Sequence, residues 1–60
     1  MELKFNRYTF TFVKEDGLNG VIYVAHNGEI REHFTLRESS PDYSNKEVFE
    51  RWCKEYLEFI

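Results

Sequence analysis

Two pairs of turn-forming residues, Asp16-Gly17 and Asn27-Gly28, constrain the fold of this chain more than any other feature. Asp-Gly and Asn-Gly favour two-residue hairpin turns, because a type I′ turn needs a positive φ at both of its central residues. Around these turns, apolar and polar residues alternate with the period of two that is typical of a half-buried strand. The pattern predicts three antiparallel strands, at residues 3–14, 20–26 and 29–37.

The two predicted turns place one set of side chains on the same face of the sheet. Folding about the first turn sets Phe10 opposite Tyr23, and folding about the second sets Ala25 opposite Ile30 and Tyr23 opposite Glu32. A slip of one residue would move a whole strand's side chains to the other face. We therefore predict an apolar face made of Tyr8, Phe10, Phe12, Val21, Tyr23, Ala25, Ile30, Phe34 and Leu36.

Two local features leave alternatives open. Leu3 and Phe5 have the opposite parity to the rest of the first strand, which indicates a bulge or a strand start near Asn6. Gly20 allows residues 15–20 to form a longer loop in place of the two-residue turn.

The last third of the chain predicts a helix. Residues 39–42, Ser-Ser-Pro-Asp, end the sheet, and Ser44 with Glu47 has the spacing of a capping box, although Ser40-Pro41 is a competing earlier start. From residue 46 to 60, apolar residues recur with helical spacing and predict one buried stripe, made of Val48, Phe49, Trp52, Cys53, Tyr56, Phe59 and Ile60. The predicted fold is α+β: a three-stranded antiparallel β-meander with one C-terminal α-helix packed on one face (β-β-β-α).

Size and charge narrow the class of protein. Sixty residues make a single domain, 1–60, near the lower limit for folding without metal or disulfide, and an aromatic content of 18% supplies part of the core. A net charge of −3 opposes a dedicated nucleic-acid binder. One cysteine cannot form an internal disulfide, and the sequence contains neither a signal peptide nor an apolar run of about 20 residues. We expect a cytoplasmic protein without membrane association.

The residue types used in catalysis and metal binding are scattered by this register. His26 and His33 are predicted on the face away from the helix but about four residues apart, which is too far for one metal ion. Cys53 belongs to the helix stripe and is predicted to be a small buried hydrophobe. Glu32 falls on the aromatic face, where it can reach water at an edge or accept a hydrogen bond from a tyrosine. We expect no cofactor, no metal and no enzymatic activity.

The outer face of the predicted sheet is the candidate binding surface. Its centre is Ile22 and Val24, framed by threonines, and its rim is basic. The predicted partner-binding residues are Arg7, Thr9, Thr11, Ile22, Val24, His26, Arg31, His33 and Thr35. This surface predicts a protein-binding module, an inhibitor or regulator of another protein, which is a profile shared by small accessory proteins of phages and mobile elements.

Other partners are alternatives. Because antiparallel sheets also read DNA, the same face supports a nucleic-acid-binding module as the second reading. The acidic side of the helix, which includes Glu50 and Glu58, is another candidate contact surface. The apolar arc of the helix is wider than a three-stranded sheet need cover, which predicts a homodimer through Leu57 and Ile60 or through Ile22 and Val24.

Overall fold

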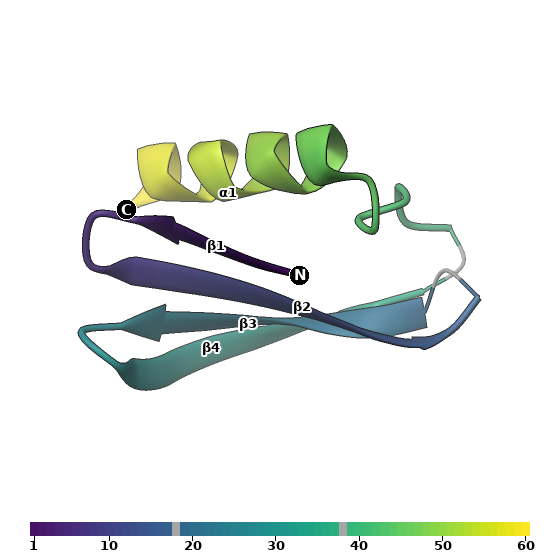
Figure 1. Ribbon diagram of the computed structural model, residues 1–60, viewed down its shortest axis with the longest axis horizontal. Helices are drawn as coiled ribbons and strands as arrows, with labels where there is room; N and C mark the ends of the chain where they lie inside the picture. The colour runs from purple at the N-terminus through teal and green to yellow at the C-terminus, as the bar shows by residue number, and fades with distance from the viewer. Residues whose placement is uncertain (18, 38) are drawn as a thin grey trace.

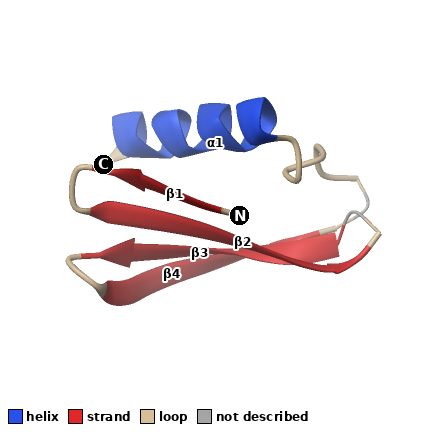
Figure 2. Ribbon diagram, in the orientation of Figure 1, coloured by secondary structure: helices blue, strands red, loops and turns tan. Residues whose placement is uncertain are grey.

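The computed structural model describes residues 1–17, 19–37 and 39–60, and shows a four-stranded antiparallel sheet with one helix along one side (Figure 1). The strands lie in the order β1-β2-β3-β4. Their bounds are Glu2–Phe5 (β1), Tyr8–Asp16 (β2), Asn19–His26 (β3) and Glu29–Leu36 (β4), and the helix α1 spans Lys46–Phe59 (Figure 2). The α+β class and the C-terminal helix are confirmed, whereas the predicted number of three strands is wrong.

The additional strand arises from a third tight turn, which divides the predicted first strand in two. Asn6, in this turn, has a φ of 56°, a conformation that asparagine tolerates better than most residues. Phe5 therefore lies opposite Tyr8, and Leu3 lies opposite Phe10. The change of parity in the sequence marks a reversal of the chain and the start of a second strand.

The pairing of β2 with β3 differs from the predicted register by one residue. Phe10 lies opposite Val24 and not opposite Tyr23. The difference arises at an irregularity between Lys14 and Asp16, close to the end of the hairpin. The predicted position of the turn at Asp16-Gly17 is therefore wrong, because Asp16 belongs to β2 and lies opposite Asn19. The alternative, a longer loop over residues 15–20, is also wrong, because Gly20 belongs to β3.

The pairing of β3 with β4 follows the prediction only next to its turn. Both central residues of that turn have a positive φ, 53° and 82°, and Ala25 lies opposite Ile30 as predicted. A second irregularity then shifts the ladder, so that Tyr23 lies opposite His33 and not opposite Glu32.

These two irregularities together invert β3 within the sheet. Because each shifts the register by one residue, the predicted inward residues of β2 keep their face, as do Phe34 and Leu36 of β4, while those of β3 do not. Ile22 and Val24 are fully buried in the core, with no exposed area. The prediction that Val21, Tyr23 and Ala25 face the helix is wrong, because they alternate with the buried residues and lie on the outer face. The prediction that Ile30 faces the helix is also wrong, because Ile30 lies before the irregularity of β4, opposite Ala25 on the outer face.

Gly20 gives a physical reason for this register. It is buried on the side of β3 that faces the helix. A Cβ atom at this position would lie 2.7 Å from Cε1 of Phe12, so the phenylalanine ring occupies the space that the missing side chain leaves. The same register buries Ile22 and Val24, whereas the predicted register would leave both in water.

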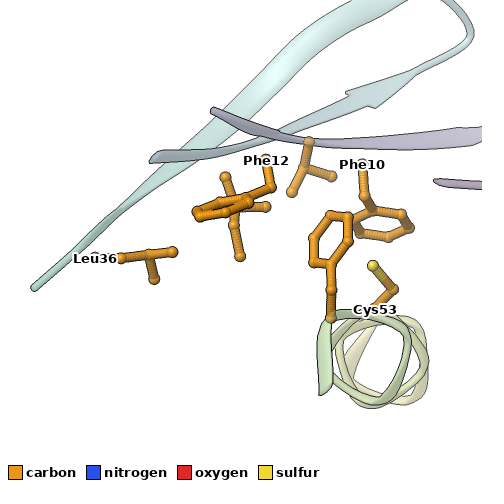
Figure 3. Packing of buried hydrophobic residues seen from close by; sticks show 7 residues of the cluster. Phe10, Phe12, Leu36 and Cys53 are labelled. Atoms are coloured by element: carbon orange, nitrogen blue, oxygen red, sulfur yellow. The ribbon is translucent and has the colours of Figure 1, made fainter. Parts of the chain in front are cut away.

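The core lies between the sheet and α1. Figure 3 shows Phe10 and Phe12 extending from β2 on the side of the sheet where Cys53 lies on the helix. Tyr56, Trp52 and other partly buried side chains pack around this cluster. The fully and nearly fully buried residues are Phe10, Phe12, Ile22, Val24, Leu36, Phe49 and Cys53.

The helix begins where the sequence predicts, but its cap is a different residue. The side-chain oxygen of Asn45 accepts hydrogen bonds from the backbone N–H groups of Glu47, at 3.0 Å, and Val48, at 3.4 Å. Ser44 is engaged elsewhere, because its backbone N–H and its hydroxyl both donate to Asp42. The predicted capping box led by Ser44 is therefore wrong, as is the competing start at residues 40–41.

The end of the helix also departs from the predicted buried stripe. Trp52, Cys53 and Tyr56 pack against the sheet as predicted. Phe59 is 94% exposed and Ile60 is 62% exposed. The apolar arc of α1 therefore continues past the surface that the sheet covers.

Candidate functional site

The predicted partner-binding residues do not form one surface. Thr9, Thr11, His33 and Thr35 lie on the outer face of the sheet, as the alternation with their buried neighbours requires. Ile22 and Val24, the predicted centre, belong to the core. The prediction that these two residues meet a partner, or a second copy of the chain, is wrong.

The predicted basic rim is also divided. The ring of His26 stacks on Tyr8 at a centroid distance of 4.4 Å, on the side of the sheet that faces the helix and not on the outer face. Arg7 lies in the turn between β1 and β2. Arg31 lies at the irregularity of β4 and forms an exposed ion pair with Glu29 at 3.4 Å. The predicted rim therefore does not lie together on the outer face, because His26 is on the opposite side of the sheet.

The outer face retains some apolar character from residues that the sequence analysis placed inside. Tyr23 lies next to His33, with ring centroids 6.4 Å apart. Val13 is exposed on the same face, as is Ile30 near the β3–β4 turn, with 67% of its surface accessible. Threonines lie among these side chains, with Thr11 opposite Tyr23 and Thr35 opposite Val21.

A concave site lies elsewhere, between β4 and the C-terminal half of α1. It is an open groove of about 480 Å³. We call it the β4–α1 groove, and its lining residues are Glu32, Phe34, Trp52, Glu55, Tyr56, Phe59 and Ile60. Alternation along β4 brings Glu32 and Phe34 to one face of the sheet, and helical spacing aligns the remaining lining residues on one side of α1.

Three aromatic rings form the apolar part of the groove. Trp52 and Tyr56 stack on each other, with centroids 5.6 Å apart and an interplanar angle of 19°. Phe34 meets both nearly at right angles, at 5.2 Å from Trp52 and 6.0 Å from Tyr56. Such pairs stabilise by roughly 0.5–1.5 kcal/mol each beyond the burial of their area, so this part of the groove is preformed.

A hydrogen bond joins the two walls of the groove. The hydroxyl of Tyr56 donates to a carboxylate oxygen of Glu32 at 3.0 Å. Burial raises the pKa of Tyr56, and the hydrogen bond to Glu32 raises it further, so the phenol stays protonated at neutral pH. Of the two alternatives for Glu32, a position at the edge in water and a hydrogen bond from a tyrosine, the second is observed, and Glu32 is also exposed. Its strand partner is Val24 and not Tyr23.

Cys53 lies behind the groove, within the core. Burial raises the pKa of its thiol to about 12, and the nearby Glu50 carboxylate adds to this effect. The group is therefore a neutral thiol at physiological pH, and its predicted burial is confirmed. A thiol that stays protonated is a poor nucleophile and a poor metal ligand.

The exposure of Phe59 was not predicted, whereas Ile60 was placed both in the buried stripe and, with Leu57, in a possible dimer contact. The apolar arc of the helix is wider than a small sheet can cover, and that excess indicates an apolar surface at the end of the helix. The groove itself had no local signal, because its walls come from segments 24 residues apart in the chain.

Comparisons of the chain with protein-family models, with curated proteins and with solved structures found no match. In the described parts of the chain, no three His, Cys, Asp or Glu residues are grouped so that they could hold a metal ion. The same residues include no helix of the length and apolar character that a membrane span requires. The geometry of the surface is therefore the basis for a functional proposal.

Proposed function

We propose that this chain is a non-enzymatic protein-binding module, which acts as an inhibitor or regulator by holding a segment of its target in the β4–α1 groove. The observation that carries the proposal is the exposure of Phe59 beside the preformed aromatic wall of Trp52 and Tyr56. Contiguous apolar surface of this kind marks interaction sites in small proteins. Covering a phenylalanine side chain contributes roughly 1.5–3 kcal/mol, so the exposed ring favours association.

The position of β4 supports a particular binding mode. β4 is the last strand in the order of the sheet, so its far side has no strand neighbour among the described residues. An extended segment of the target can pair with such an edge through main-chain hydrogen bonds. Its alternate side chains would then point to the face that carries Phe34 and would enter the groove.

Two matched substitutions test the proposal. Phe59→Ser and Ile30→Ser each remove an exposed apolar side chain, the first from the groove and the second from the outer face. Quantitative affinity capture from host lysate is expected to enrich a partner with the wild type and the Ile30 variant, and to lose it with the Phe59 variant. Loss of the partner with the Ile30 variant alone would place binding on the outer face. If the wild type enriched no partner at all, that result would contradict the protein-binding function.

The outer face supports a second candidate function, binding of single-stranded nucleic acid. Tyr23 is accessible there beside His33, and aromatic rings on an open sheet can stack with bases. The net charge of −3 acts against this function. Electrophoretic mobility shift with a thymidine oligonucleotide at two salt concentrations tests it: a salt-sensitive shift that Tyr23→Ala removes would support the function, and no shift at low salt would exclude it.

A further inference from the structure

From the electrostatics of the β4–α1 groove, we infer that its occupant is an extended segment with a lysine or arginine side chain. The cationic group lies against the rings of Trp52 and Tyr56 and near the carboxylates of Glu32 and Glu55. This inference rests on the proposed function, since it names the chemistry of the segment that the groove holds.

The charged side chains that line the groove are acidic. Among the described residues that line the groove, two are glutamates and none is a lysine or arginine. The ion pairs found in the described parts of the chain involve Glu2, Glu29 and Glu50, and neither Glu32 nor Glu55 takes part in them. Arg51 and Lys54 share a neighbouring surface hollow with Glu55, whereas Glu32 lies away from that hollow. A segment with a positive charge would therefore gain attraction that a neutral or acidic segment would not.

The C-terminal end of α1 makes the potential at the groove more negative. The groove lies at the C-terminal end of α1, where the free carbonyl groups carry a partial negative charge. The last turn of this fully described helix contains no basic residue. The helix end therefore adds to the negative potential of the two carboxylates.

The aromatic rings of the groove are suited to contact with a cation. Lysine and arginine cations bind to aromatic faces, most strongly to tryptophan, when they lie within about 6 Å of the ring centroid. Trp52 and Tyr56 present two nearly parallel rings, and Phe34 closes the side at right angles. The apolar stem of a basic side chain can lie on the exposed Phe59 while its charged group reaches Glu32.

A second copy of the same chain is a poorer occupant. Pairing of β4 with β4 of another copy would bring Glu32 of both chains onto the same face of the joined sheet. Like charges on one face of a sheet are destabilising when they come close. β4 also carries Glu29 and Arg31, which already form an ion pair within one chain.

Selection of peptides by the full 60-residue chain tests the inference. The probe is a random octapeptide library displayed on phage. Enriched peptides are expected to contain a lysine or arginine with an apolar residue two positions away, because alternate side chains of an extended segment share a face. Enrichment is expected to disappear with Phe59→Ser and to persist with Ile30→Ser.

The most enriched peptide is then titrated in solution. Trp52 is the only tryptophan of the chain and lines the groove, so its fluorescence reports binding. Replacing the basic residue of the peptide by norleucine is expected to weaken binding roughly tenfold. Glu32→Gln and Glu55→Gln are each expected to weaken it about twofold to fivefold. Glu47→Gln, at the other end of the helix, serves as the matched control and is expected to change nothing.

The outcomes separate this inference from the proposed function. Enriched peptides without basic residues that still require Phe59 would overturn the cationic specificity and leave the protein-binding function standing. A norleucine peptide that binds as tightly as its parent would do the same. If the selection enriched no peptide at all, that result would contradict both the cationic specificity and the protein-binding function. Sedimentation as a dimer that Phe59→Ser dissociates would show that a second copy fills the groove, which would overturn the inference.

Discussion

The inverted register of β3 makes a direct prediction about stability. Ile22 and Ile30 carry the same side chain, but Ile22 is fully buried between sheet and helix, and Ile30 is mostly exposed near the β3–β4 turn. Truncating a core isoleucine to alanine removes buried surface and leaves a cavity, which costs about 2–5 kcal/mol. The same change at an exposed position is expected to stay within about 0.5 kcal/mol.

This cost is large for a protein of this size. At roughly 0.05–0.15 kcal/mol per residue, a chain of 60 residues has a free energy of unfolding of about 3–9 kcal/mol. Ile22→Ala is therefore expected to remove at least about a fifth of the stability, and more than half at the middle of both ranges. Ile22→Val, which should cost only about 0.5–1.5 kcal/mol, provides a milder variant if the alanine variant does not fold.

Urea unfolding, followed by the fluorescence of Trp52 and by far-UV circular dichroism, measures these differences. The expected order of stability is wild type, then Ile30→Ala with almost the same midpoint, then Ile22→Val, then Ile22→Ala. If Ile30→Ala proved as destabilising as Ile22→Ala, the assignment of the two faces of β3 and β4 would be refuted.

Three further predictions concern the cap, the glycine contact and the thiol. Asn45→Ala is expected to lower the free energy of unfolding by about 1 kcal/mol and Ser44→Ala by less, as measured by urea titration; the reverse order would restore Ser44 as the cap. Gly20→Ala is expected to cost about 1–3 kcal/mol in the same assay, because its Cβ would overlap the ring of Phe12. Burial raises the pKa of Cys53 to about 12 in the folded chain, so between about pH 9 and 12 the folded state retains a proton that the unfolded state loses. The resulting stabilisation is complete below about pH 9 and is lost as the pH rises toward 12. Cys53→Ala should therefore make the free energy of unfolding fall less steeply with pH between about pH 9 and 11. An unchanged dependence on pH would contradict the raised pKa of Cys53.

The parts of the fold that were predicted correctly depend on neighbours in the chain. The helix at residues 46–59 follows from apolar residues with helical spacing, and the turn before β4 follows from the preference of Asn-Gly for positive φ. The inward face of β2, and that of β4 from Glu32 onward, follow from alternation. The parity of Glu32 placed it on the aromatic face, where a hydrogen bond from a tyrosine was one of two alternatives and is the one observed.

The face of β3 was decided by contacts between distant residues. Ile22 and Tyr23 are both apolar neighbours, so alternation alone does not choose which of them is buried. The packing of Phe12 over Gly20 makes that choice, together with one-residue irregularities whose energy depends on the whole sheet. A register shift of one residue exchanges the two faces of a strand, which is why Ile22 and Val24, the predicted centre of the outer face, lie in the core.

The groove likewise required the assembled structure. Amino-acid periodicity showed that α1 has more apolar surface than a small sheet can bury, but it did not show which end of the helix would remain exposed. The packing of a straight helix on a twisted sheet leaves Phe59 in water and brings Glu32 of β4 to Tyr56 of α1. Local preferences thus account for the helix and most strand ends, while long-range packing determined where a partner can bind.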